Sequence, residues 1–167
     1  MPELSTIAGI VEPLRTYNWE VQVVRSPSGV NLPDNLRFRA RSCSVPGKSF
    51  DTIEVQYKWM TWRVHGRESS DKTVEITFWE GVDMAVYNAL DNWRKAVGDW
   101  LTGRQKTKAE VSGDIQIQLQ DSQERSIKTF VLKNAYLQDL AAIELSYDTS
   151  AVVEVRATFV FDWIEER

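Results

Sequence analysis

Apolar and polar residues alternate with a period of two along much of the chain. Such runs lie at residues 19–23, 36–41, 53–59, 73–78, 115–120 and 153–162. Each run places apolar side chains on one face of a strand and polar side chains on the other. Antiparallel strands with one solvated face have this pattern, whereas the buried strands of a parallel sheet do not. The sequence therefore predicts a mainly β fold built from antiparallel strands.

One segment departs from the alternation. Between Val82 and Leu101 the apolar residues recur at i, i+3, i+4 and i+7, which is the spacing of an amphipathic helix. Gly103 follows at a position typical of a C-terminal stop. The pattern predicts one helix over about residues 82–101.

The number of runs limits the architecture. About eight strands are too many for one small open sheet, so an antiparallel β-sandwich or barrel with one flanking amphipathic α-helix is favoured. The length of 167 residues fits one domain. We expect residues 1–167 to form a single domain.

Composition removes most kinds of catalytic chemistry. The chain has one Cys and one His, so an internal disulfide is impossible and a Cys/His zinc site is nearly excluded. We interpret His65 as a turn histidine near a strand end and Cys43 as a thiol without a catalytic role. We expect no cofactor and no metal site, and we expect that the protein is not an enzyme.

Charge and hydropathy bear on location and partners. The net charge of −4 disfavours non-specific binding of nucleic acid through phosphate contacts. No run approaches the roughly 20 apolar residues of a membrane helix, and the N-terminus lacks the pattern of a signal peptide. We expect a protein that stays in a cytosol and does not bind membranes.

Arginines at alternate positions form a stripe on the predicted second strand. The stripe has two interpretations, a phosphate site or ion pairs with acidic strands, and the acidic composition favours ion pairs. The arginines are Arg37, Arg39 and Arg41, and the acidic candidates are Glu20, Glu54 and Glu75.

Another predicted strand carries neutral amide side chains along one face, at Gln116, Gln118 and Gln120. Such a face fits an interior wet surface that must not hold a passing polymer. It fits a plain solvent face equally well, and both interpretations stay open.

A cluster of large apolar residues breaks the alternation between Trp59 and Trp62. It places apolar groups on both faces of its strand, as expected of a strand buried on two sides or in contact with another subunit. A long exposed hairpin of this kind aggregates unless a partner covers it. Trp163 near the C-terminus also suggests contact with another subunit. We therefore expect a protein whose exposed apolar surfaces are covered when it assembles.

Four stretches in register resemble the tail tube proteins of T4-like contractile-tailed bacteriophages. The first is FRARSCSVPGKSFDTIEV at residues 38–55. The others are residues 64–67 with 73–78, residues 87–93 on the predicted helix, and residues 143–148 with 154–163 as a C-terminal hairpin. The resemblance covers nearly the whole chain.

The resemblance implies a β-sandwich subunit that forms hexameric rings, which stack into a rigid tube around a lumen. The same fold serves tubes of type VI secretion and contractile injection systems. Implied partners are further copies of the chain, the tail sheath protein, the baseplate or tube initiator, the tail terminator, the tape measure protein, and DNA passing through the lumen without sequence-specific binding. The implied location is the virion tail, assembled in the bacterial cytoplasm.

The same resemblance assigns candidate residues. The lumen-facing candidates are Glu54, Gln56, Lys58, Gln116, Gln118 and Gln120. The inter-subunit candidates are Phe50, Trp59, Met60, Trp62 and Trp163. A hairpin at about residues 49–63 is expected to reach the adjacent subunit or ring, and the helix is expected to lie outside, where a sheath contacts it.

Alternatives remain within and outside this family. The chain fits an initiator ring that joins the baseplate to the tube, or the inner tube of a phage-like contractile injection system. A small-ligand-binding β-barrel is the alternative of a different class.

Overall fold

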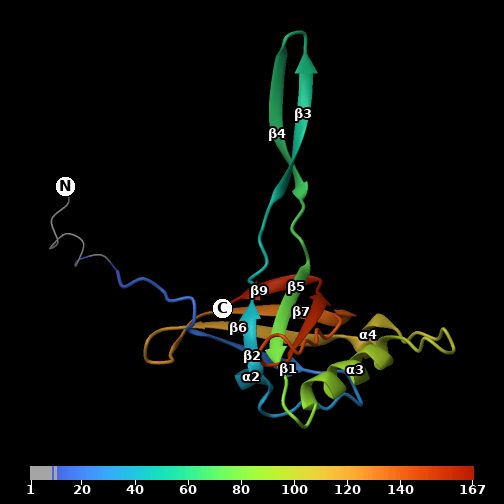
Figure 1. Ribbon diagram of the computed structural model, residues 1–167. Coiled ribbons are helices and arrows are strands. Elements are labelled where there is room, and N and C mark those ends of the chain that lie inside the picture. The colour runs from blue at the N-terminus through green and yellow to red at the C-terminus, as the bar shows by residue number, and fades with distance from the viewer. Residues whose placement is uncertain (1–8, 10) are drawn as a thin grey trace.

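Strands dominate the computed structural model, which describes residue 9 and residues 11–167 (Figure 1). The strands are β1 Trp19–Arg25, β2 Ala40–Cys43, β3 Phe50–Tyr57, β4 Met60–Glu68, β5 Thr73–Trp79, β6 Gly113–Gln120, β7 Ser126–Leu140, β8 Glu154–Val160 and β9 Trp163–Glu166. The helices are α2 Leu36–Arg39, α3 Ala85–Val97 and α4 Lys108–Val111. All strand pairs are antiparallel. The prediction of a mainly β, antiparallel fold is confirmed.

The long strand β7 joins two halves of the main sheet. Its first half pairs with β6 and β9, and its second half pairs with β8, giving the order β1-β6-β7-β8-β5-β2. Between the halves Asn134 adopts a φ of 53°, a left-handed conformation that Asn tolerates better than most residues. Side chains from both halves, among them Ile117 of β6 and Phe159 of β8, share one apolar core. The arrangement is sandwich-like.

Helix α3 covers this core and contacts mainly β7. Trp93 is fully buried, its ring lies 5.3 Å from that of Phe159, and its Nε1 donates a hydrogen bond to the carbonyl of Val111 at 3.0 Å. The helix is shorter than the predicted 82–101. Val82 and Leu101 lie outside it and are exposed, so they lack the burial that would extend the apolar stripe.

The predicted second strand is partly wrong. Residues 36–39 form the one-turn helix α2, and only Ala40–Cys43 is a strand. Leu36 donates its backbone N–H to the carbonyl of Pro33, and Phe38 donates to that of Asn35. Four alternating residues also fit one turn of helix, which is why the pattern misleads here.

The predicted strand at 143–148 is absent. Strand β7 ends at Leu140, opposite Ala157, and residues 141–153 cross to β8 as an open loop. Leu145 and Tyr147 are exposed there, because no neighbouring strand covers them.

The β3–β4 hairpin stands out from the body as a separate two-stranded sheet (Figure 1). It spans Phe50–Glu68, so it is longer than the predicted 49–63. In this hairpin His65 pairs with Thr52 inside β4, not in a turn.

Candidate assembly surfaces

The hairpin has one apolar face and one polar face. Residues opposite each other share a face, and the apolar pairs are Ile53–Val64, Val55–Trp62 and Tyr57–Met60. The expectation of apolar side chains on both faces is therefore wrong. The chain reverses at Lys58–Trp59, so Met60 and Trp62 return to the face that carries Val55.

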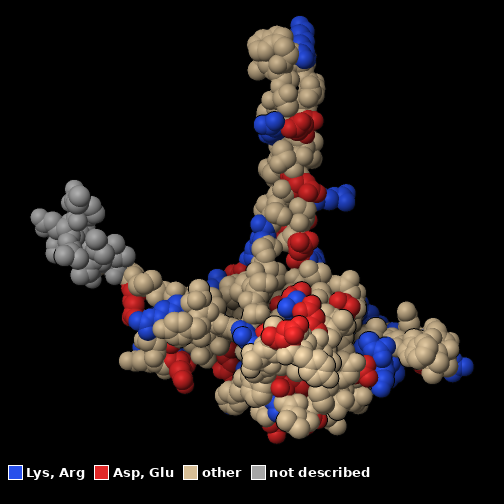
Figure 2. Space-filling view, viewed as in Figure 1, with Lys and Arg blue, Asp and Glu red and all other residues tan. Residues whose placement is uncertain are grey.

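This apolar face is open to solvent, although apolar side chains of this size are normally buried. The hairpin projects from the body, and uncharged side chains cover most of its visible surface (Figure 2). The inter-subunit candidates are exposed as follows: Phe50 66%, Trp59 86%, Met60 55%, Trp62 66% and Trp163 49%. The first four lie on the hairpin, and Trp163 lies on β9.

The base of the hairpin is held by hydrogen bonds. Ser69 donates its backbone N–H to the carbonyl of Ser49 at 2.9 Å, and the Ser49 hydroxyl donates to the carbonyl of Ser69 at 3.0 Å. The register shifts beside Asp51, where a Cβ added to Gly66 would lie 3.1 Å from the Asp51 carbonyl oxygen. Glycine thus permits the close approach that lets two residues of β4 oppose one residue of β3.

The polar face of the hairpin carries two of the lumen candidates. Glu54 lies opposite Arg63, with its carboxylate 2.8 Å from the guanidinium, and Gln56 lies opposite Thr61. Lys58 lies in the turn at a φ of 52°, with its ammonium 5.6 Å from the centre of the Tyr57 ring.

The other lumen candidates share one face of β6. Gln116 lies between Gln22 of β1 and Val131 of β7, and Gln118 lies between Glu20 and Thr129. The three glutamines are half-buried, and the Gln120 amide donates to Glu20 at 3.1 Å. They belong to the main sheet, whereas Glu54 and Gln56 belong to the separate hairpin sheet. Within one subunit the structure thus places the candidates in two groups, and their orientation toward a lumen remains a prediction.

The predicted arginine stripe is not a strand face, because Arg37 and Arg39 lie in α2. Each guanidinium contacts a carboxylate, as the ion-pair interpretation expects. Arg37 lies 3.3 Å from Glu20, Arg41 lies 2.9 Å from Glu154, and Arg39 contacts Glu80 and Asp83 at 3.4 and 3.1 Å. Glu54 pairs with Arg63 instead.

Glu80 organises the start of α3. Its carboxylate is almost fully buried and accepts backbone N–H groups of Val86 and Tyr87, at 3.4 and 2.7 Å, as well as the Arg39 guanidinium. It satisfies amide groups that the first turn of a helix leaves open. The hydrogen bond from Arg39 also holds the pKa of Asp83 below its ordinary value. Sequence reasoning missed this cluster because its members lie 41 and 44 residues apart.

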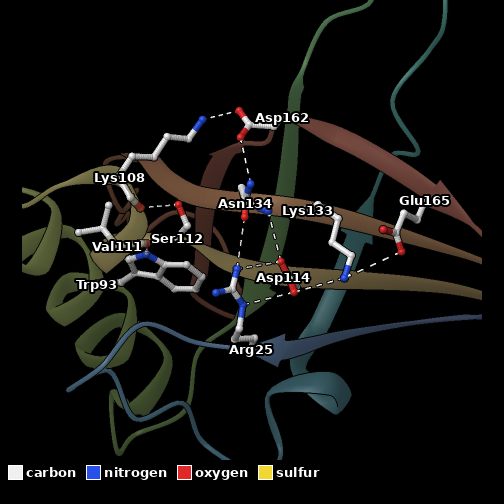
Figure 3. Close-up of polar contacts among 10 residues, drawn as sticks. All are labelled: Arg25, Trp93, Lys108, Val111, Ser112, Asp114, Lys133, Asn134, Asp162 and Glu165. Atoms are coloured by element: carbon white, nitrogen blue, oxygen red, sulfur yellow. Dashed lines mark hydrogen bonds and ion pairs between the residues drawn. The ribbon is translucent and has the colours of Figure 1, made fainter.

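A second polar cluster surrounds Asn134, the residue of β7 with left-handed backbone (Figure 3). Asp114 accepts the Asn134 backbone N–H at 3.2 Å and two guanidinium N–H groups of Arg25, each at 3.3 Å. Burial raises the pKa of Asp114, but these donors outweigh burial and the net pKa lies below the ordinary value. The Asn134 amide donates to Asp162, which also pairs with Lys108. An Asn inside a long β run is the sequence signal for this left-handed residue.

The described residues offer no candidate metal site and no reactive thiol. They contain no group of three or more His, Cys, Asp or Glu side chains that could hold a metal ion. Burial raises the pKa of the Cys43 thiol to about 12, which removes it as a nucleophile near neutral pH. None of the helices in the described part is long and apolar enough to cross a membrane.

The fold and these surfaces define a structural subunit with a projecting amphipathic hairpin. The family model of phage tail tube proteins matches residues 10–165, and the chain belongs to this family. Proteins of this family are structural components of the phage tail, so this protein is a tail component and not an enzyme. No curated protein sequence matches the chain.

Solved structures with the same fold come from contractile injection systems. The tube-terminating cap of the anti-feeding prophage has a TM-score of 0.69 at 16% identity, with 95% of this chain and 93% of that chain covered. A chain of the PVC sheath/tube terminator in its extended state has a TM-score of 0.70 at 16% identity, with 95% and 99% covered. A chain of the PVC sheath–tube complex in its extended state has a TM-score of 0.66 at 16% identity, with 100% and 99% covered. At these identities the likeness establishes the fold.

Proposed function

We propose that the chain is the subunit of a tail tube, in which hexameric rings stack into a hollow conduit for DNA inside a contractile sheath. The observation that carries this proposal is the solvent-exposed apolar face of the β3–β4 hairpin. An isolated two-stranded hairpin is marginally stable in water, and an exposed apolar strand pair favours aggregation. A neighbouring subunit that covers Val55 and Trp62 removes both problems.

The edges of the main sheet support a ring. Strands β1 and β2 form the ends of the pairing order, so each leaves backbone groups without a strand partner within the subunit. Closed rotational symmetry lets every subunit cover its neighbour's edges. In this proposal the candidates on β6 and on the polar hairpin face line the lumen, where neutral amides neither attract nor repel phosphate strongly.

The proposed partners follow from such a tube. The exposed face of α3, with Asn88, Asn92 and Lys95, lies outside and meets the sheath. The ends of the tube meet the baseplate or initiator at one end and the terminator at the other. The tape measure protein and then DNA occupy the lumen, the protein resides in the virion tail, and assembly takes place in the bacterial cytoplasm.

Sedimentation velocity over a concentration series, combined with negative-stain electron microscopy, tests the proposal. The expected result is rings or hollow tubes, formed spontaneously or on added baseplates. The matched variants are Trp62→Ser on the apolar hairpin face and Ile127→Ser, an exposed apolar side chain on β7. Trp62→Ser should abolish assembly while Ile127→Ser preserves it.

The same images separate the alternatives. Single rings that never stack identify an initiating or terminating ring, and tubes without a phage particle identify an injection system. A protein that stays monomeric even with baseplates, and that binds a small molecule saturably, contradicts the proposal and favours the small-ligand barrel.

A further inference from the structure

The loop between α3 and α4 carries exposed apolar side chains that belong to no surface described above. It spans residues 98–107, and we call it the finger. Trp100 and Leu101 are exposed by 76% and 75% within it. The finger extends from the side of the body, in a different direction from the β3–β4 hairpin (Figure 1).

Hydrogen bonds within the finger fix its shape. The Asp99 carboxylate accepts the Leu101 backbone N–H at 3.0 Å and the Thr102 hydroxyl at 2.9 Å, and the Asp99 backbone N–H donates to the Arg104 carbonyl at 2.9 Å. Gly103 adopts a φ of 68°, a left-handed conformation that glycine adopts without strain. Because the loop is already ordered, a partner that covers Leu101 costs it little further conformational entropy.

The free charges of the finger are basic. Among the described residues, Arg104 and Lys106 have no carboxylate within ion-pair distance. The Asp99 carboxylate is engaged by hydrogen bonds of the finger itself. Glu110 lies near enough to Lys106 for its pKa to be lowered slightly by that charge, but its hydrogen bonds go to Thr107. The finger thus presents two apolar side chains together with two unpaired cations.

A hollow of about 450 Å³ lies between the loop at residues 141–153 and the start of β8. Leu145 and Val152 line it and are exposed by 79% and 54%. Apolar side chains that line an open hollow lose their contact with water when another apolar group enters. The hollow therefore suits an apolar side chain from outside.

The free charges at this hollow are acidic. Glu144 lines the hollow and Asp148 lies in the same loop, and neither carboxylate has a cation within ion-pair distance among the residues that the structure describes. Arg156 also lines the hollow, but it lies 3.8 Å from Glu154. The hollow thus offers unpaired acidic groups where the finger offers unpaired cations.

The finger and the hollow lie at opposite ends of α3. The backbone N–H of Glu80 donates to the carbonyl of Val153 at 2.8 Å, and the Glu80 carboxylate accepts the backbone N–H of Tyr87 in the first turn of α3. The loop at residues 141–153 therefore ends beside the start of α3, whereas the finger follows its last turn. The 13 residues of α3 span about 20 Å, so a contact between finger and hollow joins two copies of the chain.

We propose that the finger of one copy docks in the hollow of a neighbouring copy and joins subunits around the ring. This inference rests on the proposed tube function and adds a contact to it. Two different surfaces of one chain make a head-to-tail contact, which builds a ring when the rotation between neighbours closes. The apolar tip of the finger covers the apolar lining of the hollow, and the two cations meet the two carboxylates.

Disulfide trapping in the full-length assembled protein tests the contact. One chain carries both Leu101→Cys in the finger and Thr149→Cys in the lining of the hollow, two exposed positions, and the native Cys43 is protected by its raised pKa. The control chain carries Leu101→Cys with Ile127→Cys, which is 59% exposed and lies on β7 outside the hollow. Oxidation should link the first pair about tenfold more than the control pair, because docking raises the effective concentration. A contact around a ring gives a covalent ladder that ends at six subunits.

A charge exchange gives a second measurement that does not depend on disulfide geometry. Arg104→Glu or Glu144→Lys alone should raise the protein concentration needed for assembly about tenfold, because each places like charges opposite each other. The two changes together should restore assembly to within about threefold of the unsubstituted protein. The control combines Arg104→Glu with Glu124→Lys, an exposed residue of the β6–β7 turn, which restores the net charge but not the contact.

The outcomes separate this inference from the tube proposal. Tubes in which Leu101→Cys is linked equally to Thr149→Cys and to Ile127→Cys, or in which Glu144→Lys restores assembly no better than Glu124→Lys, overturn the hollow as acceptor and leave the tube standing. A covalent ladder that continues past six subunits places the contact along the stack and overturns its position in the ring. Failure of the unsubstituted protein to assemble, with or without baseplates, overturns both proposals.

Discussion

Replacement of Glu80 by glutamine tests whether the buried cluster holds the end of the sheet and the start of α3. The Glu80 side chain is 1% exposed and that of Arg39 is 9% exposed. Glu80→Gln keeps the size and one acceptor oxygen but leaves Arg39 with only the half-exposed Asp83 as counter-charge. Removal of one partner from a buried ion pair costs about 3–5 kcal/mol. Because the amide oxygen still accepts one helix N–H, we expect a loss of about 3 kcal/mol in the free energy of unfolding.

That loss corresponds to a Tm lower by about 6–12 °C for a chain of this size. Urea unfolding monitored by tryptophan fluorescence and circular dichroism measures it. Glu75→Gln is the matched control, since Glu75 is exposed on β5 and its loss should stay within about 0.5 kcal/mol. Adding Arg39→Met to Glu80→Gln should cost less than the sum of the single changes, because the two side chains contact each other. A loss below about 1 kcal/mol, or one equal to that of the control, would refute this account of the cluster.

Three further predictions follow from the same structure. Cys43 should resist alkylation at pH 8 in the folded protein and react readily in urea, because burial raises its pKa; equal rates by mass spectrometry would contradict this. Because the pKa of Asp114 is lowered on folding, its ionised carboxylate stabilises the folded state above a pH of about 4. This stabilisation is lost as the pH falls through the folded-state pKa and the carboxylate is protonated. Asp114→Asn should therefore flatten the acid arm of the stability profile, and Asp139→Asn, at an exposed position, should leave it unchanged. Assembled tubes of Gln118→Lys should retain DNA at low salt and release it as the salt concentration rises. Gln138→Lys is the control, and equal DNA retention by the two variants would show that Gln118 does not face the lumen.

The alternation predicted strands well where both ends of a run are fixed by core packing. Residues 73–79 and 113–120 are examples, since their apolar positions meet side chains from the opposite half of the sheet in one core. It failed for the first four residues of the run 36–41, because residues 36–39 form one helical turn, and four alternating residues fit such a turn as well as a strand. The strand that the family resemblance implied at residues 143–148 is also absent, because these residues lie in a loop in which Leu145 and Tyr147 are exposed.

The hairpin illustrates what a sequence pattern leaves open. The run from Trp59 to Trp62 predicted apolar side chains on both faces, because alternation was counted straight through a chain reversal. With the reversal at Lys58–Trp59 the same residues give a single apolar face. Exposure of that face, and not its composition alone, makes it a candidate for assembly.

The polar clusters could not be predicted because their members are distant in sequence. Arg25 meets Asp114 across 89 residues, and Arg39 meets Glu80 across 41. Neither pair stands out from the many charged residues on strand faces. Pairing order and register are needed to bring them together.

The most direct test of the central claim is cryo-electron microscopy of the assembled protein, with the fate of the β3–β4 hairpin as the readout. The account predicts six-fold rings stacked into a hollow tube, with Val55 and Trp62 covered by neighbouring subunits. A particle in which the hairpins project into solvent, or a protein that remains monomeric at every concentration with and without baseplates, would contradict it.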